Sequence, residues 1–246
     1  MKITLDEIIT NKLQEIAEKK KVRGFLNAIK TPKAGNIAII AEIKLTTPSA
    51  GKLGDVIDIE KKVKSYEKGL ADAISVVVDK KYFGGDLEFI RRVKSIVSLP
   101  VLTKDFIIDP YQIYEMKAYG ADAILLIAKI LNKKKLKQYV ELCFEVGLEP
   151  IVEIQNRKEL NDAIATNTRI IAVNARDLNT FEVDMDKACG LLKFIPQYYL
   201  TLGFSGVSSR CDVEKYIASG AKGILVGTSL MKAKNIEEFI KELKSL

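Results

Sequence analysis

A short sequence that occurs three times decides the fold: Leu70–Ile74 reads LADAI, Gly120–Ile124 reads GADAI, and Gly220–Ile224 reads GAKGI. Each copy follows an amphipathic stretch and leads into an apolar, β-branched run. A glycine just past the end of a helix accepts the positive φ that closes the helix. The copies begin 50 and 100 residues apart, which predicts repeated strand–helix units of about 25 residues each.

Outward from these copies, eight short apolar runs predict strands, and longer amphipathic stretches separate them. The strands are expected at residues 36–43, 73–78, 100–103, 123–127, 149–153, 169–174, 199–203 and 223–226. Helical patterns include residues 59–68, 87–97, 109–119, 133–146 and 213–219. Parallel strands covered by helices read as continuous apolar runs, so eight units predict an α/β protein with a TIM (β/α)8 barrel. A doubly wound open sheet uses the same turns, but no G-x-G-x-x-G follows the first strand.

The length of 246 residues suits one barrel, and no Pro/Gly/Ser-rich linker divides the chain. We therefore expect residues 1–246 to form a single domain, with residues 1–36 as an N-terminal helical extension. Apolar residues of this extension fall on one helical face, namely Leu5, Ile8, Ile9, Leu13 and Ile16. Such an extension would cap the bottom of the barrel or fold over the rim of the active site.

The amino-acid composition excludes several classes of catalytic and metal site. The chain has no histidine, which excludes a Ser-His-Asp triad, a Cys-His dyad and a His-ligated metal site. Acid–base work therefore falls to lysine, aspartate, glutamate, tyrosine or cysteine. The three cysteines, Cys143, Cys189 and Cys211, form no C-x-x-C motif. We expect them in core or helix positions of a cytoplasmic protein.

The net charge of +7 favours an anionic partner. Two lysine runs, Lys19–Lys21 and Lys133–Lys135, adjoin amphipathic patterns without interleaved aromatic residues. We interpret them as solvated helix faces and expect no nucleic-acid binding. We expect no membrane partner either, because no apolar run reaches the length of a membrane span and the N-terminus lacks a continuous apolar segment. A phosphorylated small molecule is the expected partner.

Charged side chains stand at the ends of three predicted strands. Glu42 and Lys44 lie two residues apart at the end of the first strand, so they share a face. Lys104 follows the third strand, and Glu153 ends the fifth. The carboxyl ends of barrel strands meet at one mouth, where these groups would shift one another's pKa values. They are a candidate acid–base set for a chain without histidine.

Two loops predict a phosphate site. Phe204–Ser209 (FSGVSS) follows the seventh strand, and Gly227–Met231 (GTSLM) follows the eighth. In phosphate-binding barrels these two loops cradle the phosphate with backbone N–H groups. Glycines let the backbone approach closely, and serine and threonine add hydroxyl donors.

Together, the strand-end segments resemble indole-3-glycerol-phosphate synthase over essentially the whole chain, in the order of that family. The matching segments are Ile40–Lys44 (IAEIK), Thr47–Ser49 (TPS), Lys81–Phe83 (KYF), Thr103–Phe106 (TKDF), Leu125–Ile127 (LLI), Glu149–Glu153 (EPIVE), Asn174–Leu178 (NARDL), Ser205–Val207 (SGV) and Leu225–Met231 (LVGTSLM). The resemblance implies a carboxy-lyase of tryptophan biosynthesis. That enzyme closes the pyrrole ring of 1-(2-carboxyphenylamino)-1-deoxyribulose 5-phosphate and releases CO2 and water.

The resemblance also implies roles for individual residues. Lys104 would be the general acid, Glu153 the general base of the dehydration, and Lys44 the partner of the substrate carboxylate. Glu42 would orient the lysines, and Asn174 would hydrogen-bond a substrate hydroxyl. The substrate-binding residues would be Arg176, Ser205, Gly206, Gly227 and Thr228 around the phosphate, Phe83 and Leu125 at the aromatic ring, and Ser49. No cofactor or metal is implied, and we expect a cytoplasmic monomer or weak homo-oligomer.

One departure from the family stands inside a motif. The family has glutamate before SG, within AESG, where this chain has Phe204. Two alternatives to a synthase therefore stay open. One is a divergent barrel that binds a phosphorylated anionic metabolite without this catalysis, and the other is a lyase or isomerase of another sugar phosphate.

Overall fold

Eight parallel strands close into a barrel in the computed structural model, which describes residues 4–20, 24–47, 51–52 and 59–245. The strands are β1 (Ala38–Ile43), β4 (Ala73–Val77), β5 (Val101–Lys104), β6 (Ala123–Ile127), β7 (Glu149–Ile154), β8 (Ile170–Asn174), β9 (Leu200–Phe204) and β10 (Gly223–Val226). Each strand pairs with its neighbours in chain order, and β10 closes the barrel on β1. The predicted TIM barrel is confirmed, and the eight predicted strands match within two residues at each end.

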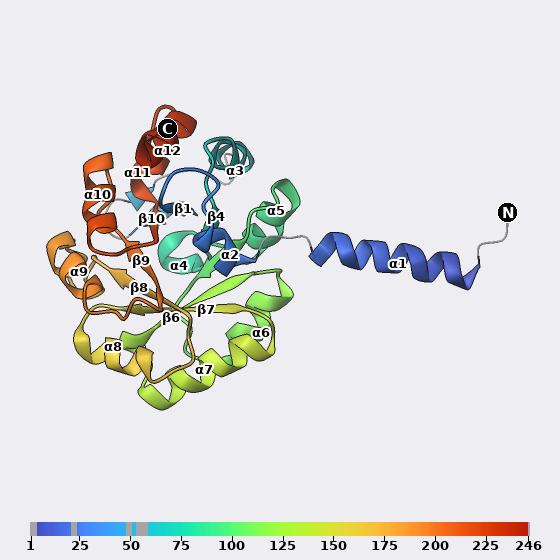
Figure 1. Cartoon of the computed structure of the whole chain (residues 1–246), viewed down its shortest axis with the longest axis horizontal. Coiled ribbons are helices and arrows are strands. Elements are labelled where there is room, and N and C mark those ends of the chain that lie inside the picture. The colour runs from blue at the N-terminus through green and yellow to red at the C-terminus, as the bar shows by residue number, and fades with distance from the viewer. Residues whose placement is uncertain (1–3, 21–23, 48–50, 53–58, 246) are drawn as a thin grey trace.

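Helices surround the strands, as Figure 1 shows. They are α3 (Ile59–Lys68), α5 (Glu88–Ile96), α6 (Pro110–Ala118), α7 (Lys133–Glu145), α8 (Arg157–Ile164), α9 (Met185–Leu192), α10 (Arg210–Ala218) and α12 (Ile236–Lys244). Short elements follow the carboxyl ends of several strands. They are the β2–β3 hairpin (Thr46–Thr47 with Gly51–Lys52), α4 (Lys80–Phe83), the 3-10 turn η2 (Ala128–Ile130) and α11 (Thr228–Lys232). No helix in the described part of the chain has both the length and the apolar character needed to cross a membrane.

Two apolar layers follow from the two-residue period of the strands. Inward-facing residues fill the barrel, among them Ile40, Leu102, Leu125, Ile151 and Leu202. Their outward-facing neighbours pack against the helices, among them Ile39, Val101, Ile124, Val152 and Ile224. Because both faces are covered, the strands read as unbroken apolar runs in the sequence. Cys143 and Cys189 are buried on helices, and Cys211 is exposed on α10.

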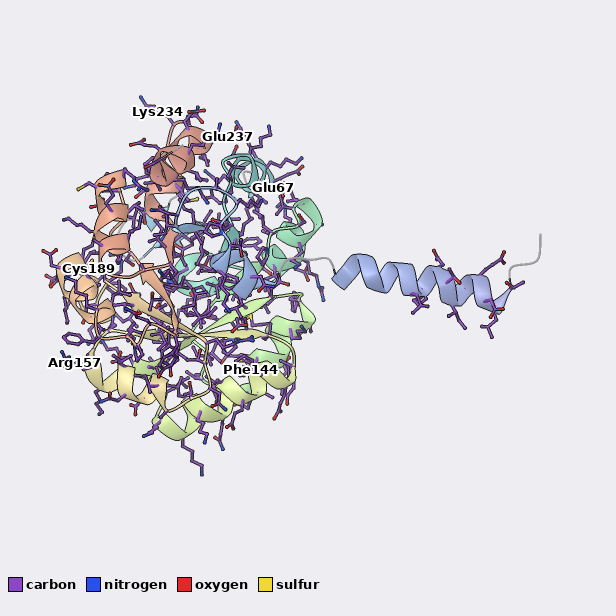
Figure 2. All side chains as sticks on the ribbon, viewed as in Figure 1. Glu67, Phe144, Arg157, Cys189, Lys234 and Glu237 are labelled. Atoms are coloured by element: carbon purple, nitrogen blue, oxygen red, sulfur yellow. The ribbon has the colours of Figure 1, made fainter. Side chains whose placement is uncertain are left out.

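The N-terminal extension contains two helices with different surroundings. The helix α2 (Phe25–Lys30) places Phe25 and Ile29 in the apolar cluster inside the barrel, with Ala38 and Leu202. This part of the extension caps the bottom of the barrel, as one of the two predicted placements required. The helix α1 (Leu5–Lys20) stands away from the barrel (Figures 1 and 2), and its apolar residues Leu5, Ile8, Ile9 and Leu13 are exposed.

In two of the three copies of the repeated sequence, an aspartate links neighbouring strands. The Asp72 carboxylate accepts the Ile39 N–H at 2.8 Å, which ties the start of β4 to β1. The Asp122 carboxylate likewise accepts the Val101 N–H at 2.8 Å, between β6 and β5. Leu70, Gly120 and Gly220, which open the three copies, all have positive φ values of 67°, 94° and 98°. The repeat therefore encodes the helix end in all three copies and a link between neighbouring strands in the two copies that have aspartate.

Candidate active site

A cavity of about 1010 Å³ opens at the carboxyl ends of the strands. Every predicted site residue that the structure describes lines it, namely Glu42, Lys44, Phe83, Lys104, Leu125, Glu153, Asn174, Arg176, Ser205, Gly206, Gly227 and Thr228. Ser49 lies outside the described residues. The structure thus brings twelve side chains or backbones, separated by up to 186 residues in sequence, to one mouth.

The strand period explains how these residues reach the mouth. Glu42, Lys104 and Glu153 each stand two positions beyond an inward-facing apolar residue of the same strand. Inward-facing residues alternate along a strand, so the next inward position after the apolar layer faces the cavity. A change from apolar to charged at that position therefore separates the packed barrel core from the site.

Glu42 lies between two lysines. Its Oε2 atom is 2.7 Å from Lys44 Nζ, and its Oε1 atom is 3.8 Å from Lys104 Nζ. The Glu42 side chain is only 2% exposed. Burial raises the pKa of Glu42, but the charges of Lys44 and Lys104 outweigh this effect and hold that pKa below its ordinary value. Glu42 is therefore an anion that holds two cations at the mouth.

Glu153 has one engaged oxygen and one that has no partner. Asn174 Nδ2 donates to Glu153 Oε1 at 3.0 Å, and Ser205 Oγ donates to Asn174 Oδ1 at 2.9 Å. Glu153 Oε2 is buried without a hydrogen-bond partner among the described residues. Burial raises the pKa of Glu153, and Lys104 and the Asn174 hydrogen bond only partly offset this rise. A carboxylate with a raised pKa and a free oxygen is suited to accept a proton.

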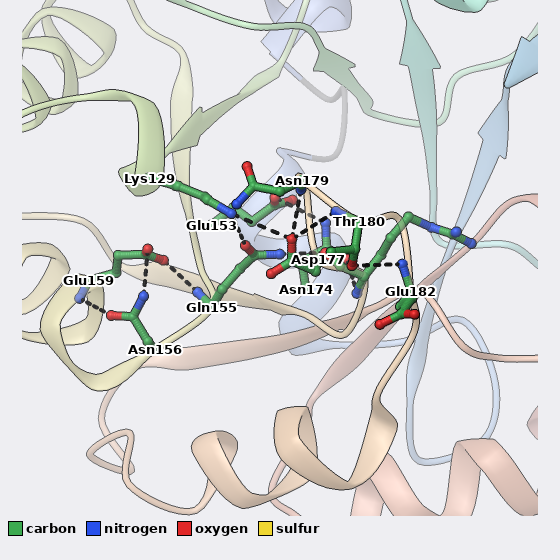
Figure 3. Close-up of polar contacts among 11 residues, drawn as sticks. Lys129, Glu153, Gln155, Asn156, Glu159, Asn174, Asp177, Asn179, Thr180 and Glu182 are labelled. Carbon is green, nitrogen blue, oxygen red and sulfur yellow. Dashed lines mark hydrogen bonds and ion pairs between the residues drawn. The ribbon is translucent and has the colours of Figure 1, made fainter. Parts of the chain in front are cut away.

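A polar network behind Glu153 fixes the loops after β7 and β8 (Figure 3). The Gln155 side-chain amide donates to the Arg176 carbonyl, and the Gln155 N–H donates to Glu159 Oε2 at 2.6 Å. Asp177 accepts the N–H groups of Asn179 and Thr180, which turns the chain after β8. The Arg176 N–H in turn donates to Asn174 Oδ1 at 3.0 Å, so this network is connected to the residue that binds Glu153.

Phe204 occupies the inward position at the end of β9. Its side chain is fully buried, and its backbone pairs with Asn174 on β8 and Leu225 on β10. The Lys104 Nζ atom lies 5.2 Å from the centroid of its ring. Phe204 is therefore part of the surroundings of Lys104.

The two predicted phosphate loops lie side by side. Ser229 Oγ donates to the Val207 carbonyl at 2.6 Å, which joins the loop after β10 to the loop after β9. Ser205 and Gly206 both have positive φ values, 68° and 86°, so the chain turns sharply here, and both residues line the cavity. Arg176 borders this region, where its guanidinium donates to the Phe181 carbonyl at 2.7 Å.

Gly227 serves the charged cluster as well as the loop. A Cβ atom on Gly227 would lie 2.2 Å from Glu42 Oε2 and 3.1 Å from Lys44 Nζ. Only a residue without a side chain leaves room for this ion pair. The sequence indicated a phosphate role for Gly227, and the structure adds this steric one.

The opposite wall of the cavity is aromatic, and sequence reasoning found only part of it. Phe83 and Phe106 face one another with ring centroids 6.3 Å apart, and Tyr82 borders the same wall. Asp79 caps α4 by accepting the N–H groups of Tyr82 and Phe83. Phe106, Asp79 and Asp105 line the cavity but were not among the predicted site residues.

A signal for these three residues was present in the sequence. Phe106 and Asp105 directly follow Lys104, and Asp79 precedes Tyr82 by the three residues typical of an N-cap. Burial raises the pKa of Asp105.

The arrangement as a whole suits one class of ligand. It offers cations and hydroxyls for anionic groups, an aromatic wall for a ring, an ammonium that can donate a proton and a carboxylate that can accept one. A molecule with an aromatic ring, a carboxylate and a phosphate fits each of these features.

Comparisons with known proteins agree with this site. The family model described as indole-3-glycerol phosphate synthase matches residues 3–243. A relative of that name from Thermoanaerobacter sp. is 41% identical over 259 aligned positions, which cover 98% of this chain and 99% of the relative. One from Aquifex aeolicus is 41% identical and covers 94% and 90%.

Solved structures show the fold alone. The tryptophan synthase A-subunit from Pyrococcus furiosus has a TM-score of 0.66 at 16% identity and covers 87% of this chain and 99% of its own. A 3-hexulose-6-phosphate synthase has the same TM-score at 13% identity and covers 85% and 99%.

Proposed function

The chain belongs to the indole-3-glycerol phosphate synthase family, and from that premise we propose how the residues of its cavity carry the reaction. The substrate is 1-(2-carboxyphenylamino)-1-deoxyribulose 5-phosphate, and the products are indole-3-glycerol phosphate, CO2 and water. The proposed enzyme class is a carboxy-lyase. The proposed chemistry uses only side chains of this chain, and the observation that carries it is the meeting of Lys104, Glu42 and Glu153 at one mouth.

Lys104 acts as the acid of the ring closure. The ring carbon that bears the carboxylate attacks the ketone carbon, and a C–C bond forms. The Lys104 ammonium gives its proton to the ketone oxygen, which becomes a hydroxyl. The C–C bond to the carboxylate then breaks, CO2 leaves, and its bonding electrons restore the aromatic ring. Lys104 Nζ lies 3.8 Å from Glu42 Oε1, which is too far for a short ion pair that would hold its proton back from the substrate.

Glu153 acts as the base of the dehydration. Its Oε2 atom takes a proton from the new five-membered ring, and the hydroxyl leaves as water with a proton from an acid at the mouth. Electrons from the broken bond to hydrogen form the second double bond of the pyrrole. The buried, unpartnered Oε2 and the raised pKa of Glu153 support this role.

The other residues bind and orient the substrate. Lys44 pairs with the anthranilate carboxylate, and Glu42 holds Lys44 and Lys104 in place. Asn174 hydrogen-bonds a substrate hydroxyl. The proposed phosphate site is made by Arg176, Ser205, Gly206, Gly227 and Thr228, and the ring site by Phe83 and Leu125. Ser49, which lies outside the described residues, is a further binding residue implied by the family resemblance.

We also propose the domain organisation, the partner, the oligomeric state and the location of the protein. We treat residues 1–246 as one barrel domain with residues 1–36 as its helical extension, because β1 and β4 to β10 form one closed barrel. The partner is a phosphorylated small molecule and not a nucleic acid. The enzyme is a cytoplasmic monomer or weak homo-oligomer.

A product assay on the wild-type chain tests the proposal. Indole-3-glycerol phosphate is followed by its fluorescence, against a low background because the chain has no tryptophan. Released CO2 is measured in parallel, and we expect one CO2 for each indole formed. Binding of the substrate without either product would instead favour a divergent binding barrel. Lys94→Ala, which changes a lysine on the helix layer, is the control and should keep full turnover.

A further inference from the structure

The ammonium of Lys104 reaches across the barrel mouth to an aromatic ring. Lys104 ends β5 and Phe204 ends β9, and in the closed barrel these strands are four positions apart in either direction. The two residues therefore face one another across the full width of the barrel. Lys104 Nζ lies 5.2 Å from the Phe204 ring centroid. This distance is within the range of about 6 Å at which a cation is attracted to an aromatic face.

The Phe204 ring is held rigidly. Its side chain has no exposed surface, and it belongs to the apolar cluster inside the barrel. Its carbonyl accepts the Ala175 N–H at 2.9 Å and the Tyr216 hydroxyl at 3.1 Å, which fixes the strand end from two sides. A cation–ring contact that is shielded from water is stronger than an exposed one. Phe204 therefore presents a buried, uncharged ring to the Lys104 ammonium.

The other partners of Lys104 hold it less firmly. In the described part of the chain, Glu42 Oε1 is the one carboxylate oxygen within 4.0 Å of Lys104 Nζ, at 3.8 Å. Glu42 is itself held more closely by Lys44, at 2.7 Å. The charged groups that share this space are Glu42 and Lys44 at the end of β1, Glu153 on β7 and Arg176 after β8.

We propose that Phe204 is a positioning residue for Lys104, whose ammonium it holds over the reaction centre by a cation–ring contact. The proposal rests on the proposed role of Lys104 as general acid. An aromatic ring attracts the cation and accepts no proton, so it positions the acid without weakening it.

A series of phenylalanine analogues at position 204 tests the proposal. Site-specific incorporation of 4-fluoro-, 3,5-difluoro- and 3,4,5-trifluorophenylalanine withdraws electrons from the ring in steps while the shape changes little. We expect kcat to fall with each step, by about tenfold at the trifluoro analogue. KM should stay within about twofold, because Phe204 is not among the cavity-lining residues.

Two controls separate electronic from steric effects. 4-Methylphenylalanine at position 204 is bulkier than the fluorinated analogues but electron-rich, so it should retain kcat. The same fluorinated series at Phe25, which is buried inside the same barrel at its opposite end, should leave kcat unchanged. The proposal is overturned if kcat is flat across the fluorinated series or if the methyl analogue has the lowest kcat.

A measurement without substrate separates this inference from the proposed function. The 19F resonance of 4-fluorophenylalanine at position 204 should shift when Lys104→Ala removes the ammonium. An unchanged resonance refutes the contact, even if the wild-type chain is an active synthase. A shifted resonance in a chain that forms no indole would instead support the contact and reject the proposed function.

Discussion

The two ends of the barrel hold buried charges in opposite ways. At the carboxyl end, Glu153 is buried with one oxygen unpartnered, and Lys104 lies 3.8 Å from Glu42. At the amino end, Asp72 and Lys244 form an ion pair of 2.7 Å, and neither side chain is exposed. The first set has groups left over for a ligand, whereas the second is closed.

Every polar side-chain atom of the Asp72–Lys244 pair has a partner among the described residues. Asp72 accepts the N–H groups of Lys33 at 2.6 Å and Ile39 at 2.8 Å in addition to the Lys244 ammonium. Lys244 also donates to the Ala34 carbonyl at 3.0 Å. The pair therefore ties the C-terminal helix α12 to the segment before β1 and to β4. Buried charges support stability where their hydrogen bonds are complete and chemistry where they are not.

The largest expected effect is the loss of turnover when Glu153 can no longer accept a proton. Glu153→Gln keeps the shape of the side chain and its contact with Asn174. We expect kcat to fall by about 10³-fold, the scale of general base catalysis. Turnover by indole fluorescence measures this change, and near-wild-type activity would refute the role of Glu153.

The same variant should make the protein more stable at neutral pH. Because burial raises the pKa of Glu153, the folded chain carries an unfavourable carboxylate at any pH above that pKa. The glutamine removes this penalty, and we expect the melting temperature at pH 8 to rise by about 2–4 °C. Below the ordinary carboxyl pKa of 4.5 both folded and unfolded chains hold the proton, so the gain should disappear there. A gain that is independent of pH would contradict the account.

The closed pair at the amino end should show the reverse behaviour. Lys244→Met leaves Asp72 charged and buried without its cation, and we expect a loss of about 3–5 kcal/mol in the free energy of unfolding. The kcat of the folded fraction should not change. Urea denaturation and turnover are measured on the same sample. Lys241→Met, on the exposed side of the same helix, is the control and should change stability by less than about 1 kcal/mol.

A smaller effect is expected when a methyl group is added beside the Glu42–Lys44 pair at the carboxyl end of the barrel. Gly227→Ala places a methyl group 2.2 Å from Glu42 Oε2, so the Glu42–Lys44 pair must move. We expect kcat/KM to fall by about 10²-fold, the scale of a displaced catalytic group. Gly190→Ala is the matched control, because nothing lies within 4 Å of its Cβ position in α9. It should stabilise the protein by about 0.5–1 kcal/mol and leave turnover unchanged.

The smallest effect is expected at Asp122, the second aspartate that links two neighbouring strands. Asp122 occupies the same place in its repeat as Asp72, but its side chain is 22% exposed and its partner Lys94 is 27% exposed. We expect Asp122→Ala to lower the free energy of unfolding by about 1 kcal/mol, measured by urea denaturation. A loss as large as that of Lys244→Met would show that burial is not what separates the two sites.

The barrel and most of its mouth were predictable from local sequence. The short apolar runs located all eight strands, and the charged residues at the strand ends located Glu42, Lys104 and Glu153. Both signals depend only on residues that are close in sequence, so they can be recognised before the fold is known. The glycine, serine and threonine residues after the last two strands located the phosphate loops, whereas the substrate and the role of Asn174 came from the family resemblance.

Contacts across the barrel were not predictable in this way. The Lys104–Phe204 contact joins strands that are 100 residues apart in sequence, and the Asp72–Lys244 pair joins residues 172 apart. No local pattern marks either partner for the other. The same holds for Gly227, whose missing side chain is explained by Glu42 on a neighbouring strand.

The most direct test of the whole account is the turnover of Lys104→Ala beside the wild-type chain, at equal concentrations of folded protein. The account predicts indole-3-glycerol phosphate from the wild type, a loss of at least about 10³-fold in kcat for the variant, and an unchanged circular dichroism spectrum. A variant that forms indole at the wild-type rate would contradict it, because the open charges at the carboxyl end would then not be the catalytic ones.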